Sequence, residues 1–121
     1  MDSLILCLIP LLIQVESGGQ NDAVGDNGRA VGCLQMWEIC VDDVNRISGR
    51  SYTYEDRLSR TKSVEMVTIY LTHYGKHYER TTGKKVTMEI LARNYNGNPV
   101  NGYKNPKTLI YWAKVQKASA K

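Results

Sequence analysis

The stretch Leu11–Met36, LLIQVESGGQNDAVGDNGRAVGCLQM, decides the fold of this chain. It opens with the end of an apolar run, and this run predicts a buried helix over residues 2–17 that a pair of glycines ends. Pro10 lies inside the predicted helix, so the helix either kinks there or begins there. The glycines, asparagines and aspartates that follow predict turns, with a short hairpin around Asp26-Asn27-Gly28.

The rest of the chain predicts further helices joined by polar connections. Apolar residues recur there at spacings of three and four, which is the period of a helix with one buried face. Trp37 belongs to the first such face, and Thr87 and Thr108 stand where a helix is capped or begins. The predicted helices cover residues 34–47, 63–83, 88–95 and 108–118.

Size and composition predict one mainly α (α+β) domain over residues 1–121. The mass is 13.7 kDa, and 42% of the 121 residues are hydrophobic and 23% charged. This balance excludes disordered, collagen-like and multi-domain proteins. Residues 1–45 carry seven acids and one base, net −6, whereas residues 46–121 carry five acids and fifteen bases, net +10. Because fifteen of the sixteen basic residues lie in one part of the chain, a nucleic-acid-binding domain is only a secondary interpretation.

The cysteines and the N-terminal segment bear on the cellular compartment. We interpret Cys7, Cys33 and Cys40 as small buried hydrophobic residues, with one disulfide as the alternative, because their spacing fits neither a zinc ribbon nor a redox pair. The apolar run Leu4–Val15 looks like a signal peptide but has no basic start and no Ala-x-Ala cleavage pattern. It is also shorter than the roughly 20 residues that span a bilayer, so we expect no stable membrane insertion.

Glu16 is the acid in the most unusual position. It closes an apolar run, so the predicted helix carries a carboxylate out of the core in its last turn. The dipole at a helix C-terminus and apolar surroundings both disfavour the anion, which favours the protonated form that a general acid needs. The alternative is an exposed glutamate at a fraying helix end.

Four short motifs follow one another along the chain in a characteristic order. They are VESGG at residues 15–19, GDNG at 25–28, GCLQM at 32–36 and YNGNP at 95–99. In these motifs the sequence resembles the lysozyme-like superfamily, in particular the soluble lytic transglycosylase (SLT) domain and the goose-type lysozymes. The resemblance extends from about Leu11 to Val115.

The resemblance implies a lysozyme-like fold, with a small glycine-rich hairpin beside the active-site cleft, and a role for individual residues. Glu16 matches the catalytic acid of the family, and Ser17 is its neighbour at the helix end. Gln35 matches an amide of the cleft wall. Tyr95 and Asn96 match residues that contact sugar close to the acid. No metal and no cofactor are implied.

A second carboxylate would decide the type of reaction. Inverting hydrolysis needs a base that activates water, and Asp26 lies in a G-D-x-G turn similar to the one that carries an aspartate in goose-type lysozymes. Asp22 is a second candidate, and both residues could instead only bond their own backbone in turns. Lytic transglycosylases need no such base, because the muramic acid hydroxyl attacks and leaves a 1,6-anhydro end. The motifs favour the transglycosylase type, with hydrolysis as the alternative.

Two histidines suggest a metal site but do not make one. His73 and His77 are four residues apart on a predicted helix, which is a metal-ligand spacing. Neither a glutamate beside the first histidine nor a third ligand is evident, so we interpret both as surface or partly packed residues.

The expected substrate is peptidoglycan, cleaved at the β-1,4 bond between N-acetylmuramic acid and N-acetylglucosamine. We therefore expect a monomer whose partners are glycan strands and not nucleic acid. It would act at the cell wall, in the periplasm or outside the cell, and would reach it through a phage lysis system, as an endolysin does, or through a dedicated secretion system. Chitin-like polymers are alternative substrates. An inactive wall-binding or virion-structural module of the same fold is the alternative to an enzyme.

Overall fold

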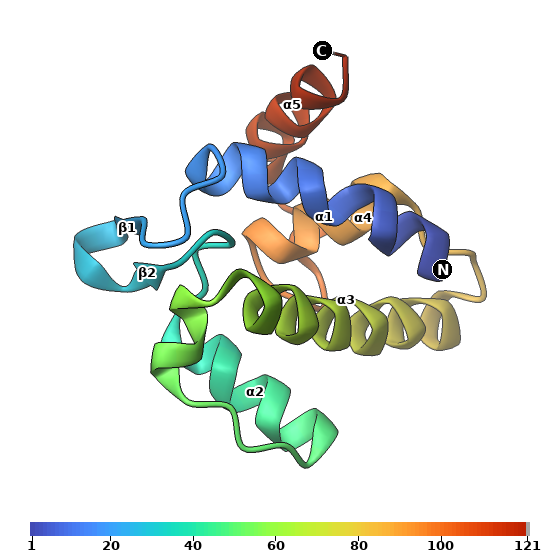
Figure 1. Ribbon diagram of the computed structural model, residues 1–121. Coiled ribbons are helices and arrows are strands. Elements are labelled where there is room, and N and C mark those ends of the chain that lie inside the picture. Colours follow the sequence, from blue (N-terminus) through green and yellow to red (C-terminus); the bar gives the residue numbers. More distant parts are fainter. Residues whose placement is uncertain (121) are drawn as a thin grey trace. The chain divides into compact units, whose positions relative to one another are not determined.

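A computed structural model describes residues 1–120 and confirms that the fold is mainly helical with one small antiparallel sheet (Figure 1). The short helices labelled η are of the 3₁₀ type. The elements in chain order are α1 (Asp2–Ser17), β1 (Val24–Gly25), η1 (Asp26–Gly28), β2 (Ala30–Val31), α2 (Glu38–Ser48), η2 (Tyr54–Leu58), α3 (Arg60–Thr82), α4 (Met88–Asn96), η3 (Gly102–Lys104) and α5 (Thr108–Ser119).

The chain folds into two compact units, which we describe one at a time. The first, here called the hairpin unit, is Ile13–Tyr70 and contains β1, β2 and α2. The second, here called the C-terminal unit, combines Met1–Leu12 with the chain from Leu71 onward and contains α4 and α5. Helices α1 and α3 each contribute residues to both units. That the whole chain acts as one domain stays a prediction.

The predicted helix over residues 2–17 is confirmed as α1, which continues through Pro10. A proline inside a helix removes one backbone donor, and Pro10 lies on an exposed face where water can bond the freed carbonyl. The opposite face of the same helix is buried through Ile5, Leu8 and Leu12. Burial of this apolar face therefore stabilises the helix in spite of the proline.

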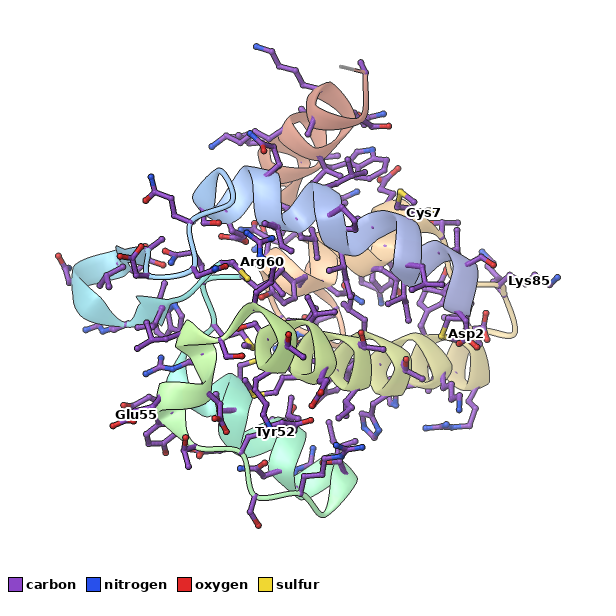
Figure 2. All side chains as sticks on the ribbon, in the orientation of Figure 1. Asp2, Cys7, Tyr52, Glu55, Arg60 and Lys85 are labelled. Carbon is purple, nitrogen blue, oxygen red and sulfur yellow. The ribbon has the colours of Figure 1, made fainter. Side chains whose placement is uncertain are left out.

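The expectation of buried cysteines is wrong for Cys7. Cys33 is buried and Cys40 is partly buried, but Cys7 is exposed on α1 beside Leu6 (Figure 2). All three thiols are free, so the alternative of a disulfide is not realised among these residues. The N-terminal run is apolar nearly all round, and only one face of its helix is buried.

The predicted hairpin around Asp26 is confirmed in the hairpin unit (Figure 1). Strands β1 and β2 pair antiparallel, with Val24 opposite Val31, and η1 connects them. A further bridge joins Val31 to Met36. The core of this unit is formed mainly by apolar side chains from β2, the following turn, α2 and α3: Ala30, Cys33, Leu34, Met36, Val41, Val44, Met66 and Val67.

Helix α2 begins four residues later than the predicted helix over residues 34–47. Residues 32–35 form a turn, and the N–H and carbonyl of Met36 bond to Val31, so this segment belongs to the hairpin. Trp37 is extended and precedes the helix, with 40% of its surface exposed, instead of lying on a buried helical face. Apolar spacing alone could not separate a turn that packs into the core from the first turn of a helix.

The polar connection over residues 48–60 contains η2, which a capping box stabilises. Thr53 Oγ1 accepts from Asp56 N, and Asp56 Oδ2 accepts from Thr53 N. Helix α3 starts at Arg60, three residues before the predicted start at Ser63. The Ser63 hydroxyl does not cap the helix, because it is buried and donates to the carbonyl of Arg57.

In the C-terminal unit, the predictions for the last two helices are confirmed. Thr87 Oγ1 accepts from Ile90 N and caps α4, and α5 begins at Thr108 as expected. Inside the connecting loop, Tyr103 N donates to Oδ1 of the buried Asn94 at 2.7 Å. The polar loop after α4 is therefore anchored by a side chain of α4 itself.

Candidate functional site

Glu16 lies in the last turn of α1, in the hairpin unit, and its side chain is half-buried. The helix ends directly after it, because Gly18 and Gly19 have φ values of +63° and +96°. Arg60 Nη2 donates to the carbonyl of Gly19 and so ties this turn to the start of α3. The chain therefore presents Glu16 at a well-defined helix end and not on a fraying one.

Ser17 supports this helix end. Its hydroxyl donates to the carbonyl of Ile13 at 3.1 Å and accepts from Gly19 N at 3.1 Å. Both bonds connect the last helical turn to the loop that follows. The observed contacts of Ser17 are thus with the backbone, and its predicted contact with substrate stays a prediction.

Asp26 stands at the tip of the hairpin, with an exposed side chain. Asp26, Asn27 and Gly28 have φ values of +50°, +58° and +89°, so three successive residues adopt the left-handed conformation. Asp26 Oδ2 accepts a long hydrogen bond of 3.4 Å from Nε1 of Trp37. Asp22, the second candidate, is exposed in the turn before β1. The hairpin therefore holds the carboxylate of Asp26 at the surface of this unit.

Gln35 cross-links the two ends of the hairpin. Its Nε2 donates to the carbonyls of Ala23 and Gly32, each at 3.0 Å, and its own φ is +51°. Its Oε1 packs against Gly25, where an added Cβ would lie 2.6 Å away. The amide nitrogen of Gln35 is thus committed to the hairpin backbone, so its observed contacts are structural.

Arg57 was not identified from the sequence, although it organises this region. It is 7% exposed, and its Nε donates to the carbonyl of Tyr54 at 2.8 Å. Its Nη1 donates to the carbonyls of Met36 at 3.0 Å and Arg29 at 3.3 Å. A carboxylate oxygen of Glu38 lies 3.9 Å from Nη2. One buried guanidinium therefore joins η2 to the residue before β2 and to Met36, which forms the bridge to Val31 of β2.

A second residue that sequence reasoning missed is Trp37. The guanidinium carbon of Arg29 lies 5.4 Å from the centroid of the indole ring, a cation–π arrangement. An open cavity of about 400 Å³ lies beside the ring. Its lining consists of Asn27, Gly28, Arg29, Trp37, Glu38 and Ile39. Nothing in the sequence distinguished this tryptophan from a core residue, because it fits the apolar spacing of α2.

Tyr95 and Asn96 belong to the C-terminal unit, in the last turn of α4. Tyr95 is half-buried and Asn96 is exposed, and Gly97 N donates to the carbonyl of Arg93 at 3.0 Å to end the helix. Glu16 and the other candidates from the first 35 residues thus belong to the hairpin unit. The structure places the two predicted sugar contacts of YNGNP together in the other unit.

The thiols of Cys33 and Cys40 are poor nucleophiles at neutral pH. Burial raises the pKa of Cys40 to about 12, with a further contribution from Asp43, and burial also raises the pKa of Cys33. Because the thiolate is the reactive form, both residues stay protonated and inert at neutral pH.

Neither a metal cluster nor a membrane-spanning helix is found between residues 1 and 120. No three His, Cys, Asp or Glu side chains in this part of the chain lie close enough together to hold a metal ion. None of the helices described for it is long and apolar enough to cross a bilayer.

Comparison with known proteins identifies the fold. No protein-family model and no curated protein sequence matches the chain. Among solved structures, the chain is similar to the crystal structure of Tapes japonica lysozyme, with a TM-score of 0.71 and 26% sequence identity. The match covers 92% of this chain and 86% of that one, and it does not distinguish an SLT-type from a goose-type relationship. The chain therefore has the lysozyme-like fold that the order of its motifs predicted.

Proposed function

We propose that this protein is a muramidase, an enzyme that cleaves the β-1,4 bond between N-acetylmuramic acid and N-acetylglucosamine in peptidoglycan. The observation that carries the proposal is the position of Glu16, half-buried at the end of α1 in a lysozyme-like fold. The similarity to a solved lysozyme over 92% of the chain supports the same function.

In the proposed mechanism, Glu16 is the general acid. It gives its proton to the bridging glycosidic oxygen while positive charge develops at the anomeric carbon. The fixed helix end matters, because a general acid must stay within hydrogen-bonding distance of the oxygen that it protonates. Ser17 and Arg60 contribute by holding the turn that follows Glu16.

Two reactions can complete the cleavage, and the motifs favour a lytic transglycosylase. In that reaction the 6-hydroxyl of muramic acid attacks the anomeric carbon, and Glu16 takes up its proton, so that a 1,6-anhydro end forms. Hydrolysis is the second candidate, supported by the exposed carboxylate of Asp26 and by the lysozyme similarity. Asp26 would then activate the attacking water. Asp22, which no contact described above holds in place, is the weaker candidate for that role.

Substrate contacts are proposed for Gln35, Tyr95 and Asn96, and more weakly for Ser17. Asn96 is exposed and offers an amide to sugar hydroxyl or acetamido groups. For Gln35 the contact has to come from Oε1 or from the adjacent backbone, because Nε2 already donates to two carbonyls.

The proposed place of action is the cell wall, with glycan strands as partners and a monomer as the active form. The net charge of +10 over residues 46–121 favours approach to an anionic wall, and added salt should weaken this attraction. The export routes expected from the sequence stay predictions.

The substitution Glu16→Gln tests the proposal. It removes the transferable proton but keeps the size of the side chain, and loss of a general acid lowers the rate by about 10²–10⁴-fold. Release of muropeptides from purified sacculi is the measurement. Glu55→Gln is the matched control, because Glu55 is exposed on η2 and projects away from the ribbon (Figure 2). The assignment of Glu16 would be refuted by a Glu16→Gln protein that is as stable as the wild type and still releases muropeptides at the wild-type rate.

Mass analysis of the products separates the two reactions. Anhydro ends are lighter by one water than reducing ends. Asp26→Asn should abolish a hydrolytic reaction but leave transglycosylation close to the wild-type rate. A wild-type protein that binds sacculi and releases nothing is instead a wall-binding or structural module.

A further inference from the structure

Three asparagines of the chain are each followed by a glycine, and such a pair is prone to deamidation. Glycine has no Cβ, so its backbone nitrogen can approach the side chain of the preceding asparagine closely. The backbone between the two residues also has to rotate, and the fold therefore decides which pair reacts. The three pairs are Asn27-Gly28, Asn96-Gly97 and Asn101-Gly102.

Deamidation of such a pair consumes one water and releases one ammonia. The backbone nitrogen of the glycine attacks Cγ of the asparagine, the Cγ–Nδ2 bond breaks, and ammonia leaves with the amide proton of the glycine. The intermediate is a five-membered succinimide ring. Water opens this ring at either carbonyl and leaves aspartate or isoaspartate. Near neutral pH, both products carry one more negative charge than asparagine.

In the C-terminal unit, both glycine nitrogens are bonded to the backbone. Gly97 N donates to the carbonyl of Arg93 at 3.0 Å, in the bond that ends α4. Gly102 is buried, and its N donates to the carbonyl of Asn98 at 2.8 Å. A Cβ placed at Gly97 would lie 3.0 Å from Cγ2 of Thr108. One placed at Gly102 would lie 2.7 Å from the carbonyl oxygen of Arg93. Rotation at either pair therefore requires the packed unit to open.

The pair in the hairpin unit is held less tightly. Asn27 and Gly28 are both exposed in η1, between β1 and β2 (Figure 1). Outside the hairpin tip itself, no atom of residues 1–120 lies within 4 Å of the place where a Cβ at Gly28 would stand. The turn is closed by a bond of 3.2 Å from Arg29 N to the carbonyl of Asp26. Asn27 has φ and ψ values of +58° and +37°, so its peptide with Gly28 must rotate before the attack. That rotation requires only one surface turn to open.

We propose that Asn27 is a deamidation site of the folded protein and that the fold protects Asn96 and Asn101. The reaction places a second carboxylate directly beside Asp26 at the tip of the hairpin. The isoaspartate product also lengthens the backbone of η1 by one methylene group. This inference is independent of the proposed function, because it follows from the backbone of the loops and not from the chemistry of a substrate.

Peptide mapping after prolonged incubation tests the proposal. The folded protein is kept at mildly alkaline pH, which speeds the attack by removing the glycine amide proton, and is then digested with trypsin. Cleavage after Arg29 puts Asn27 in the peptide 1–29, and cleavage after Arg93 puts both other asparagines in the peptide 94–104. Tandem mass spectrometry detects the exchange of amide for acid at each position. We expect Asn27 to react at least about tenfold faster than Asn96 or Asn101.

Two controls separate the effect of the fold from the effect of the sequence. In concentrated urea the backbone contacts are lost, so all three asparagines should react at similar rates. Asn27→Gln keeps an amide but would have to close a six-membered ring, which forms far more slowly, so its peptide 1–29 should keep its mass. Three results would each overturn the proposal: Asn27 keeps its amide in the folded protein, Asn96 or Asn101 reacts there as fast as Asn27, or the mass change in peptide 1–29 persists in Asn27→Gln.

Discussion

Each of the two units contains a glycine-containing loop that is held by one arginine, but the two arginines work differently. In the hairpin unit, Arg57 donates to the carbonyls of three separate segments and has its nearest described carboxylate oxygen at 3.9 Å. In the C-terminal unit, Arg93 pairs with Glu89 at 2.8 Å and donates to Thr108 Oγ1 at 2.8 Å and to the carbonyl of Asn105 at 3.2 Å.

This difference shows that an arginine can be held by peptide carbonyls in one loop and mainly by side chains in another. Peptide carbonyls cannot turn toward water without moving the chain, so Arg57 fixes the backbone of the hairpin. The partners of Arg93 are more adaptable, because Glu89 is partly exposed and Thr108 also bonds to Gly102. We therefore expect changes in the hairpin unit to have larger effects than equivalent changes in the C-terminal unit.

The largest effect is expected at the glycine that lies against each arginine. An added Cβ at Gly32 would lie 1.8 Å from the carbonyl oxygen of Arg57, and the φ of Gly32 is +89°. At Gly102 the corresponding distance to the Arg93 carbonyl oxygen is 2.7 Å. We expect Gly32→Ala to lower the free energy of unfolding by more than about 3 kcal/mol, and Gly102→Ala by about 1–3 kcal/mol.

Urea unfolding of the two alanine variants measures this contrast. Equal losses in both would mean that the close approach at Gly32 is relieved by a small backbone shift, and the comparison between the loops would then lose its main support.

The second effect concerns the arginines themselves. Arg57→Met removes the donor to three carbonyls, of which only that of Met36 keeps a described second donor, Val31 N, and should cost about 2–4 kcal/mol of stability. Arg93→Met removes one carbonyl bond and lets Glu89 turn to water, so it should cost about 1–2 kcal/mol. Thermal unfolding of both variants tests which substitution costs more stability. A smaller loss for Arg57→Met than for Arg93→Met contradicts the interpretation that Arg57 fixes the hairpin.

The parts of the fold that could be predicted from the sequence are those that depend on residues close together in the chain. Helix α4 follows from its Thr87 cap, and α4 and α5 both follow from apolar spacing, and these are properties of neighbouring residues. The start of α2 depends on the pairing of Met36 with Val31, which no local pattern reports. The same applies to Ser63, whose hydroxyl bonds to Arg57 and not to its own helix.

The residues of the candidate site fall into the same two groups, those with a local sequence pattern and those without one. Glu16 and Asp26 are candidates because a helix end and a glycine-rich turn are visible in the sequence, and their roles stay predictions. Arg57 lies in a polar segment that predicts solvent exposure, and only the fold shows that it is buried. Trp37 has the spacing of a core residue and is exposed because the helix begins after it. Contacts between residues far apart in the chain, such as those of Arg57, produce no pattern that a single sequence shows.

A smaller effect is expected from the amide that closes the hairpin. Gln35→Leu keeps the approximate size of the side chain but removes the donor to the carbonyls of Ala23 and Gly32. We expect a loss of about 1–2 kcal/mol and faster hydrogen exchange confined to the hairpin. Unchanged exchange in residues 23–36 would show that the backbone pairing alone holds the hairpin and that the side chain of Gln35 is available to substrate.

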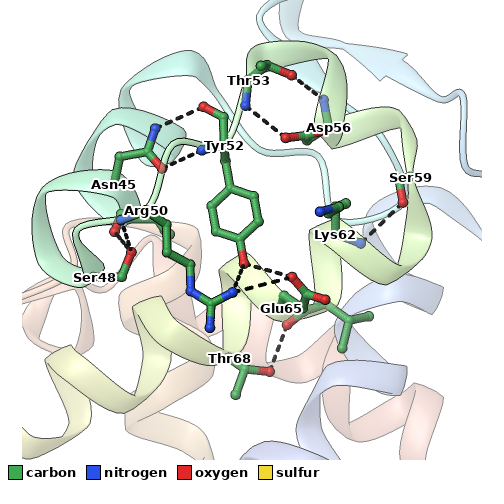
Figure 3. Close-up of polar contacts among 12 residues, drawn as sticks. Asn45, Ser48, Arg50, Tyr52, Thr53, Asp56, Ser59, Lys62, Glu65 and Thr68 are labelled. Atoms are coloured by element: carbon green, nitrogen blue, oxygen red, sulfur yellow. Dashed lines mark hydrogen bonds and ion pairs between the residues drawn. The ribbon is translucent and has the colours of Figure 1, made fainter.

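The smallest effect at neutral pH is expected at Tyr52, where the hairpin unit holds its loop to α3 (Figure 3). The Tyr52 hydroxyl donates to Glu65 Oε1 at 2.7 Å and accepts from Arg50 Nη1 at 3.3 Å. Burial, with the bond to Glu65, raises the pKa of Tyr52 above its ordinary value of 10.0. Tyr52→Phe should cost about 0.5–1.5 kcal/mol near pH 7, because Glu65 and Arg50 are both partly exposed and can bond to water.

The pH dependence of stability distinguishes the contribution of the Tyr52 hydroxyl from the contribution of the packing of its ring. Because the folded protein holds the Tyr52 proton more tightly than the unfolded chain, the stability present below pH 10.0 is lost as the pH rises through the raised pKa. Tyr52→Phe has no proton to lose at this position, so its stability should fall less steeply above that pH. Urea midpoints measured at neutral and alkaline pH check this. Parallel losses in wild type and variant would mean that other groups cause the alkaline unfolding.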